Sequence, residues 1–81
     1  SIYPNPVRKN YFKINLPNYY GQTKLWLYDI SGTLIRNLVI PETLNNPRDF
    51  ELSTKGLSSG VYIMILENGC TTKQLKFAIE K

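Results

Sequence analysis

The sequence contains no histidine and only one cysteine, and these two absences exclude much of the chemistry open to a small protein. Without histidine the chain lacks the commonest general base, the commonest metal ligand and the side chain that changes charge near neutral pH. Cys70 alone cannot form a disulfide within the chain or build a cysteine zinc site, and its usual activating base is missing. We therefore predict a protein that is not an enzyme and that binds no metal and no cofactor.

Long apolar segments are also missing. The longest apolar run, residues 61–66, is far shorter than the roughly 20 residues of a membrane-spanning helix. No basic-then-apolar targeting segment opens the sequence, and we expect no membrane span. The 81 residues suffice for one domain, residues 1–81, and the start at Ser1 rather than Met leads us to expect a domain cut from a longer protein.

The net charge of +4 comes from ten basic and six acidic residues, and the whole excess lies at Arg8, Lys9, Lys13 and Lys24. Aromatic residues interleave with these charges, as they do in proteins that bind single-stranded nucleic acid. No cluster is denser than the pair Arg8-Lys9, which is too sparse for the basic stripe of such binders. We therefore expect no nucleic-acid partner, and we interpret the charge as a solvated face that keeps a small domain soluble.

Short runs of alternating apolar and polar residues, bounded by Gly, Pro, Asn and Ser, recur along the chain and predict β-strands. No window of 11 or more residues shows the apolar stripe of a helix. The expected strands are an edge or entry segment at residues 2–7, and runs at residues 12–16, 25–30, 34–40, 49–53, 61–67 and 70–79. Six or seven short strands in a chain of this length indicate an all-β sandwich or small barrel.

Glycines and apolar faces refine this pattern. Ser31-Gly32 favours a tight turn, and Asn68-Gly69 favours a hairpin with antiparallel strands. The most apolar strand, residues 61–67, should be central in its sheet, and Gly60 just before it should let another backbone approach closely. Apolar residues occupy both faces of residues 25–30, so we expect that strand to be covered on both sides or to present aromatic residues outward.

Few residues suggest chemistry. Asp49 and Glu51 share one face of a predicted strand, but a glycosidase pair needs separated positions in a cleft, and a solvated edge explains them better. Tyr19, Tyr20 and Trp26 could stack sugars or bases if they share a face, and otherwise they anchor the core or a loop. These aromatic residues leave open an accessory module that binds carbohydrate or its own enzyme.

Four motifs follow one another along the chain. They are Y-P-N-P at residues 3–6, L-Y-D-x-x-G at residues 27–32, L-x-x-G-V-Y at residues 57–62 and a lysine-containing terminal strand at residues 72–81. In this order and spacing they resemble the type A C-terminal sorting domain of the Bacteroidetes type IX (Por) secretion system, across nearly the whole chain. One departure is that Gln74 separates Lys73 from Leu75, where the family usually carries Lys directly before an apolar pair.

The resemblance implies a compact, immunoglobulin-like antiparallel β-sandwich of six to seven strands at the C-terminus of a larger cargo protein. It implies a non-catalytic sorting signal that is recognised by outer-membrane components of the type IX machinery and removed by a sortase-like protease. The cargo would then be secreted or displayed on the cell surface by way of the periplasm. The partners implied are the secretion machinery, its sortase and the cargo domain in the same chain.

The motifs also supply the candidate recognition residues. These are Tyr3, Pro4, Asn5, Pro6, Tyr28, Asp29, Gly32, Gly60, Tyr62, Lys73, Leu75, Lys76, Phe77 and Lys81. For Gly32, Gly60, Tyr28 and Tyr62 we favour a purely fold-defining role. We expect the terminal strand at a sheet edge, where its unpaired backbone groups and a basic face, made by the three lysines, meet a receptor.

Two other hypotheses stay open beside the sorting module. The first is the accessory module, which needs Trp26, Tyr19 and Tyr20 on one exposed platform. The second is a single-strand nucleic-acid binder of the OB type, whose binding would depend steeply on salt concentration.

Overall fold

A computed structural model of the chain describes residues 2–3, 5–16, 22–41, 48–69 and 71–81. Within these ranges the chain forms seven strands, close to those expected from the alternating pattern. They are β1 (Ile2–Tyr3), β2 (Tyr11–Leu16), β3 (Thr23–Asp29), β4 (Leu34–Ile40), β5 (Arg48–Ser53), β6 (Gly60–Asn68) and β7 (Thr71–Ile79). In the described ranges no helix is long and apolar enough to cross a bilayer.

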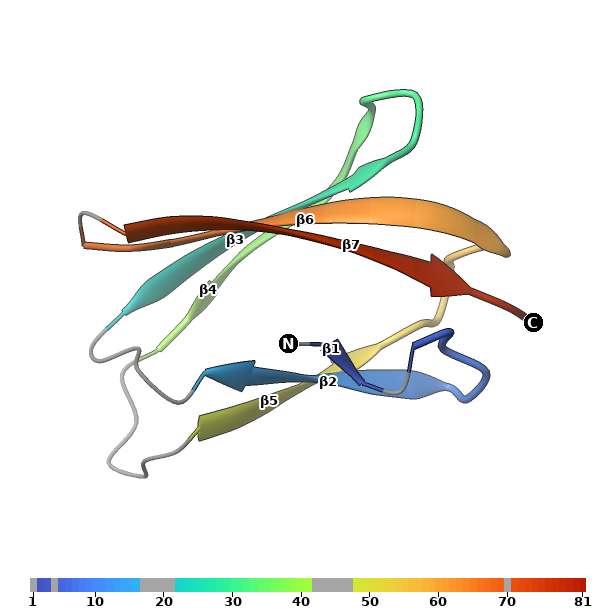
Figure 1. Ribbon diagram of the computed structural model, residues 1–81, viewed down its shortest axis with the longest axis horizontal. Coiled ribbons are helices and arrows are strands. Elements are labelled where there is room, and N and C mark those ends of the chain that lie inside the picture. Colours follow the sequence, from blue (N-terminus) through green and yellow to red (C-terminus); the bar gives the residue numbers. More distant parts are fainter. Residues whose placement is uncertain (1, 4, 17–21, 42–47, 70) are drawn as a thin grey trace.

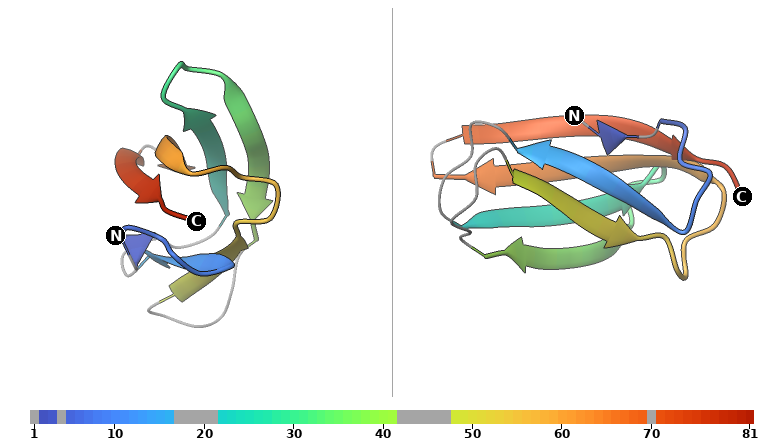
Figure 2. Two further views of the ribbon diagram at one scale, coloured as in Figure 1. Left: turned by 90° about the vertical axis from the view of Figure 1, so that its right-hand side faces the viewer. Right: turned by 90° about the horizontal axis from the view of Figure 1, so that it is seen from below.

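The strands form two packed sheets, and the predicted all-β sandwich is confirmed (Figures 1 and 2). One sheet has the order β1-β2-β5 and the other β4-β3-β6-β7, with antiparallel pairing between all neighbours. The predicted central strand, β6, lies between β3 and β7 in the larger sheet. The terminal strand, β7, lies at the edge of that sheet, as expected.

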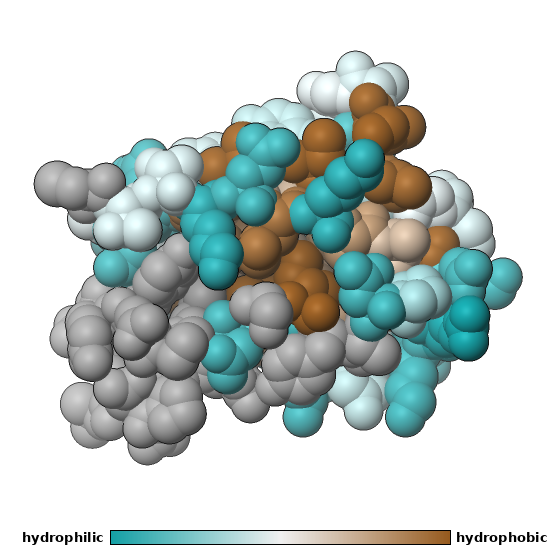
Figure 3. Space-filling view, viewed as in Figure 1, coloured by the Kyte–Doolittle hydropathy of each residue, from teal (hydrophilic) through white to brown (hydrophobic). Residues whose placement is uncertain are grey.

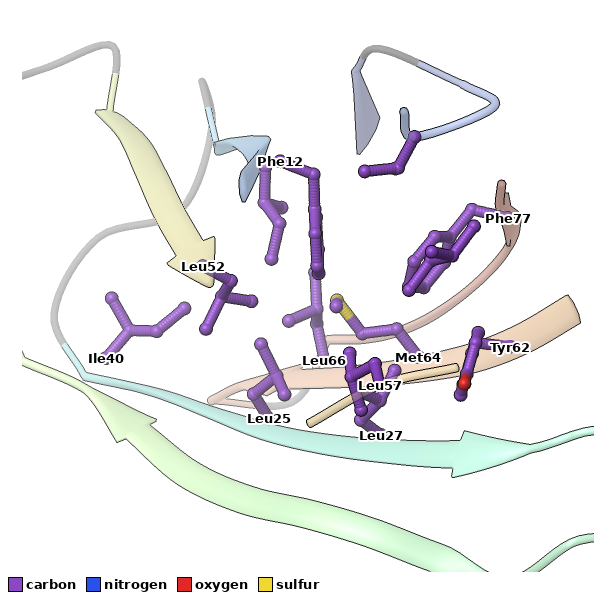
Figure 4. Close-up of a cluster of buried hydrophobic side chains, with 13 residues drawn as sticks. Phe12, Leu25, Leu27, Ile40, Leu52, Leu57, Tyr62, Met64, Leu66 and Phe77 are labelled. Carbon is purple, nitrogen blue, oxygen red and sulfur yellow. The ribbon is translucent and has the colours of Figure 1, made fainter. Parts of the chain in front are cut away.

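The core lies between the sheets and is built from every second residue of the longer strands (Figure 4). The buried hydrophobic residues are Val7, Phe12, Ile14, Leu25, Leu27, Ile40, Leu52, Leu57, Tyr62, Met64, Leu66, Phe77 and Ile79. Phe12 of one sheet packs on Phe77 of the other, with ring centroids 4.9 Å apart. Tyr62 stacks on Phe77 with ring centroids 5.9 Å apart. Each large side chain buried in this way contributes about 1.5–3 kcal/mol.

The outer face of β3 presents aromatic residues, which is the second of the two arrangements expected for this strand. Trp26 and Tyr28 are half-buried there, while Leu25 and Leu27 point into the core. A break in the β3–β4 register lies between Leu27 and Tyr28. Beyond it, apolar side chains gather on the surface around the β3–β4 turn (Figure 3). The exposed large hydrophobic residues are Ile30, Leu34, Ile35 and Val39.

The expected hairpin between residues 61 and 79 is present, but its turn lies one residue later than the Asn68-Gly69 signal suggested. Asn68 pairs with Thr71, so the turn begins after Asn68 and Gly69 belongs to it. Gly69 has a φ of +58°, which favours glycine at this position. Asn68 is fixed in the strand because its amide Nδ2 donates to the carbonyl oxygen of Gln22 and to Oγ1 of Thr23, each at 3.0 Å.

The expectation for Gly60 is wrong. A Cβ atom built at this position meets nothing within 4 Å, so no other backbone approaches closely. Its φ of +159° instead lies at the margin of the region that L-residues avoid, just where the chain enters β6. The need for glycine is therefore conformational and does not arise from packing.

A polar bridge closes the sandwich on the side of β4. The guanidinium group of Arg36 donates to the carbonyl oxygens of Ser53 and Lys55, at the end of β5 in the opposite sheet. Arg36 therefore joins two edge strands that make no ladder with each other. An arginine suits this place because its fork of donors reaches two carbonyl groups at once.

Candidate recognition surface

Residues 5–8, which follow the start of the Y-P-N-P motif, bind the end of β7 and are named the N-terminal clasp. The backbone N–H of Val7 donates to the carbonyl oxygen of Ala78 at 2.8 Å, and the N–H of Glu80 donates to the carbonyl oxygen of Val7 at 2.8 Å. Val7 and Ile79 form a parallel bridge. The N–H of Ala78 donates to Oδ1 of Asn5 at 3.2 Å. The clasp therefore joins the start of the chain to its last strand (Figure 2).

Burial and backbone bonds hold the clasp more firmly than charge does. Val7 is fully buried and belongs to the core. Arg8 Nε lies 2.7 Å from Glu80 Oε2, but both side chains are more than half exposed, at 71% and 56%. Such an exposed ion pair contributes only about 0–1 kcal/mol. No local pattern predicts the pairing of Arg8 with Glu80, because 72 residues separate them.

The remaining residues of the first motif have simpler positions. Tyr3 pairs with Lys13 in the β1–β2 ladder, and Pro4 lies outside the described residues. Pro6 is half-buried and follows a cis peptide bond from Asn5. The motif thus leads the chain out of β1 and supplies the first two residues of the clasp, Asn5 and Pro6.

Asp29 organises the turn between β3 and β4. Its Oδ1 accepts hydrogen bonds from the N–H of Ser31 at 3.0 Å, the hydroxyl of Ser31 at 2.6 Å and the N–H of Thr33 at 3.0 Å. Gly32, at φ +92°, lets the chain turn back. The Ser31 hydroxyl and the Thr33 N–H lower the pKa of Asp29 because they favour its charged form. The motif aspartate therefore acts on its own turn.

The two motif tyrosines differ in their contacts. The Tyr62 hydroxyl donates to the carbonyl oxygen of Ser58 at 2.6 Å, and its ring is buried against Phe77. A hydroxyl that bonds the backbone a few residues upstream is similar to the tyrosine corner of β-sandwiches. The Tyr28 hydroxyl donates to none of the described residues. Tyr62 therefore fixes the entry to β6, whereas Tyr28 covers the outer face of β3.

The inward residues of β7 follow the predicted alternation. Phe77 and Ile79 are buried and Leu75 is half-buried, so all three belong to the core side of the strand. Candidates Leu75 and Phe77 are therefore packing residues, and a receptor would meet their exposed neighbours instead.

The lysines of the last segment do not form the single basic face that we expected. Side chains alternate across a strand, so Lys73 and Lys76, three positions apart, lie on opposite faces of β7, and both are exposed. Lys81 lies beyond the end of β7, and its Nζ donates to the carbonyl oxygen of Thr54, the residue after β5, at 2.9 Å. The N–H of Lys81 also donates to Oγ of Ser59 at 2.8 Å. Because successive side chains of a strand point to opposite faces, two residues separated by an odd number of positions cannot share a face.

Other candidate chemistry is not brought together. Among the described residues, no group of three or more acidic, cysteine or histidine side chains lies close enough to hold a metal ion. Glu51 is exposed, which fits a solvated edge. Of the aromatic platform, only Trp26 can be placed, because Tyr19 and Tyr20 lie outside the described residues, as does Cys70.

In a comparison with protein families, residues 1–80 match the secretion system C-terminal sorting domain. Comparison with curated proteins gives no match. Among solved structures, the fold is similar to part of PorZ from Porphyromonas gingivalis, described as an essential bacterial surface component of its type-IX secretion system. That likeness has a TM-score of 0.73 at 21% sequence identity. It covers 100% of this chain and only 11% of the PorZ chain.

Proposed function

Because the chain belongs to the family of Por secretion system C-terminal sorting domains, which act as non-catalytic secretion signals, we propose that the outer-membrane translocon recognises it through the exposed parts of β7. The domain, residues 1–81, stands at the C-terminus of a larger cargo protein and directs that cargo to the cell surface or the medium. A sortase-like protease then removes it by cutting ahead of the domain.

One observation carries this proposal, which is the family match over residues 1–80. The packing adds support, because most motif residues are used to build the sandwich, and the lysines of β7 are left exposed at a sheet edge. Edge strands are sites where another chain can bind. The secretion machinery would thus read the strand that the motifs hold in place.

The test is a fusion of this chain to a passenger that carries its own periplasmic targeting signal. In a host with a type IX system, we expect the passenger at the cell surface or in the medium, and we expect it to stay in the periplasm when the translocon is absent. Deleting residues 72–81 should abolish export. Unchanged export of the passenger after this deletion would refute the proposal.

The deletion also removes Phe77 and Ile79 from the core, so it destroys the fold together with the recognition surface. Substitutions of exposed residues separate the two effects. Lys73→Ser and Lys76→Ser should lower export while the purified domain keeps its melting temperature. Lys55→Ser, at an exposed position after β5, is the matched control and should be exported normally.

The accessory binding module is not proposed as a second function. It needs three aromatic residues on one exposed platform, and among the described residues only Trp26 is placed, half-buried in the outer face of β3.

A further inference from the structure

The clasp shows which backbone groups of β7 point away from the sheet. Both the N–H and the C=O of Ala78 bond to the clasp, so they face outward and not toward β6. In an antiparallel ladder the outward-facing residues alternate with those bonded to the neighbouring strand. With the register of β6 and β7 fixed over nine pairs, the outward-facing residues before Ala78 are Thr72, Gln74 and Lys76.

The outer edge of β7 is therefore divided into two parts. From Ala78 to Glu80 it is closed by the clasp. From Thr72 to Lys76 it adjoins no strand among the described residues, because β7 is the last strand of its sheet. We name residues 72–76 the open edge. It presents a row of free N–H and C=O groups of the kind to which another extended chain can bind.

Charge flanks the open edge on both faces of the sheet. Lys73 and Lys76 are exposed and lie on opposite faces, three positions apart. An extended chain paired with β7 places one of its side chains opposite each lysine, and these two positions are also three apart. Acidic side chains at both would give favourable cross-strand pairs.

We propose that the open edge is a strand-addition site that binds an extended segment of the secretion machinery with acidic residues three positions apart. The inference rests on the proposed function, since it names the chemistry by which the translocon would read β7. The clasp limits the length of the added strand, because it occupies the edge from Ala78 onward. Backbone hydrogen bonds provide the affinity of this interaction, and the two lysines make it specific for an acidic partner.

The charge argues against a second copy of this chain as the occupant. Two β7 edges paired with each other would bring four lysines together without an acidic partner from the open edge. Lysines on an edge strand are a common means of preventing such self-pairing. An acidic segment from another protein satisfies the same lysines.

Gln74→Pro tests the proposal with little effect on the fold. The N–H of Gln74 faces outward, so proline there removes a donor from the open edge but none from the β6–β7 ladder. Gln74→Ala keeps the N–H and is the matched control. In the passenger fusion we expect Gln74→Pro to lower the exported fraction about tenfold, the loss of one well-made hydrogen bond, and Gln74→Ala to be exported like the wild type.

Charge reversal tests the acidic partner independently. Lys73→Glu and Lys76→Glu should each lower export about two- to fivefold, since each replaces an attractive cross-strand pair by a repulsive one. Lys55→Glu makes the same change in net charge at an exposed position that follows β5 and lies outside the open edge, and it should leave export unchanged. These variants alter only exposed side chains, so they serve even if the proline variant does not fold.

The outcomes separate the two proposals. If the wild-type fusion is not exported, the proposed function fails. If it is exported and a folded Gln74→Pro variant, checked by circular dichroism, is exported equally well, strand addition is refuted while the proposed function stands. Unchanged export of both charge-reversal variants refutes the acidic partner. A wild-type dimer that Gln74→Pro converts to a monomer would identify a second copy as the occupant and overturn the proposal.

Discussion

Replacing Tyr62 by phenylalanine removes one hydroxyl group and tests whether this motif tyrosine serves the fold. The hydroxyl donates to the carbonyl oxygen of Ser58 at 2.6 Å, while the ring stays buried against Phe77. A hydrogen bond of this kind contributes about 0.5–1.5 kcal/mol net. Ser58 is exposed, so water can reach its carbonyl group in the variant, and we expect a loss of about 1 kcal/mol.

For a domain of this size, a loss of 1 kcal/mol lowers the melting temperature by about 4–8 °C. Tyr28→Phe is the matched control, since the Tyr28 hydroxyl donates to none of the described residues, and its effect should stay within about 0.5 kcal/mol. Thermal and urea unfolding of the purified domain, followed by circular dichroism, measures both variants. Equal melting temperatures for the two variants would refute the assignment of Tyr62 to the fold.

Three further predictions follow from the described contacts. Asp29→Asn should make the stability depend less on pH in acid. Because the pKa of Asp29 is lowered in the folded state, its carboxylate stabilises the fold at pH values above the ordinary pKa of 3.8. This stabilisation is lost as the pH falls through the folded-state pKa. Urea midpoints at pH 6 and pH 3 check this, and identical pH profiles for variant and wild type would contradict it. Phe77→Ala should cost about 3–5 kcal/mol, a large part of the total stability of a small domain, and a calorimetric melting temperature near that of the wild type would rule this out. Arg8→Ala should cost less than about 1 kcal/mol, with a smaller effect at high salt, because its partner Glu80 is exposed; a drop of more than 8 °C would show that the pair matters more.

Alternation of apolar residues predicts the strands of this fold well. Phe12 and Ile14, or Phe77 and Ile79, mark the inward face at period two, and burial of these side chains confirms it. The hydrophobic effect acts on whole strands, so the sandwich and its central strand follow from the pattern. The turn at Gly32 is equally local and was also predictable.

No local sequence pattern predicts the contacts between segments that lie far apart in the chain. The bonds from the clasp to Ala78, and those from Arg36 to Ser53 and Lys55, depend on how two sheets pack. The sequence predicts the role of Gly60 wrongly, because a glycine is equally typical of a positive φ and of a close backbone approach, and the structure shows only the positive φ.

The lysines show a different limit. Composition suggests a basic terminal strand, but the face on which each lysine lies follows from its position along that strand, and Lys81 lies beyond the last ladder pair. Strict alternation already separates Lys73 from Lys76. The opposite placement of the two lysines therefore follows from their positions along the strand, which the sequence alone provides.

The parallel bridge between Val7 and Ile79 has a mechanical consequence. A pull on the chain ahead of residue 2 loads the β1–β2 ladder first, because β1 precedes the clasp and pairs with β2. If β7 is held at the open edge, the pull on the clasp and the point that holds β7 lie at the same end of the parallel pair. The bonds of the clasp then open one after another, beginning at Asn5. They would be loaded together, in shear, only if the chain were held beyond Glu80. The end of β7 at which a receptor holds the domain therefore decides how firmly the clasp resists a pull.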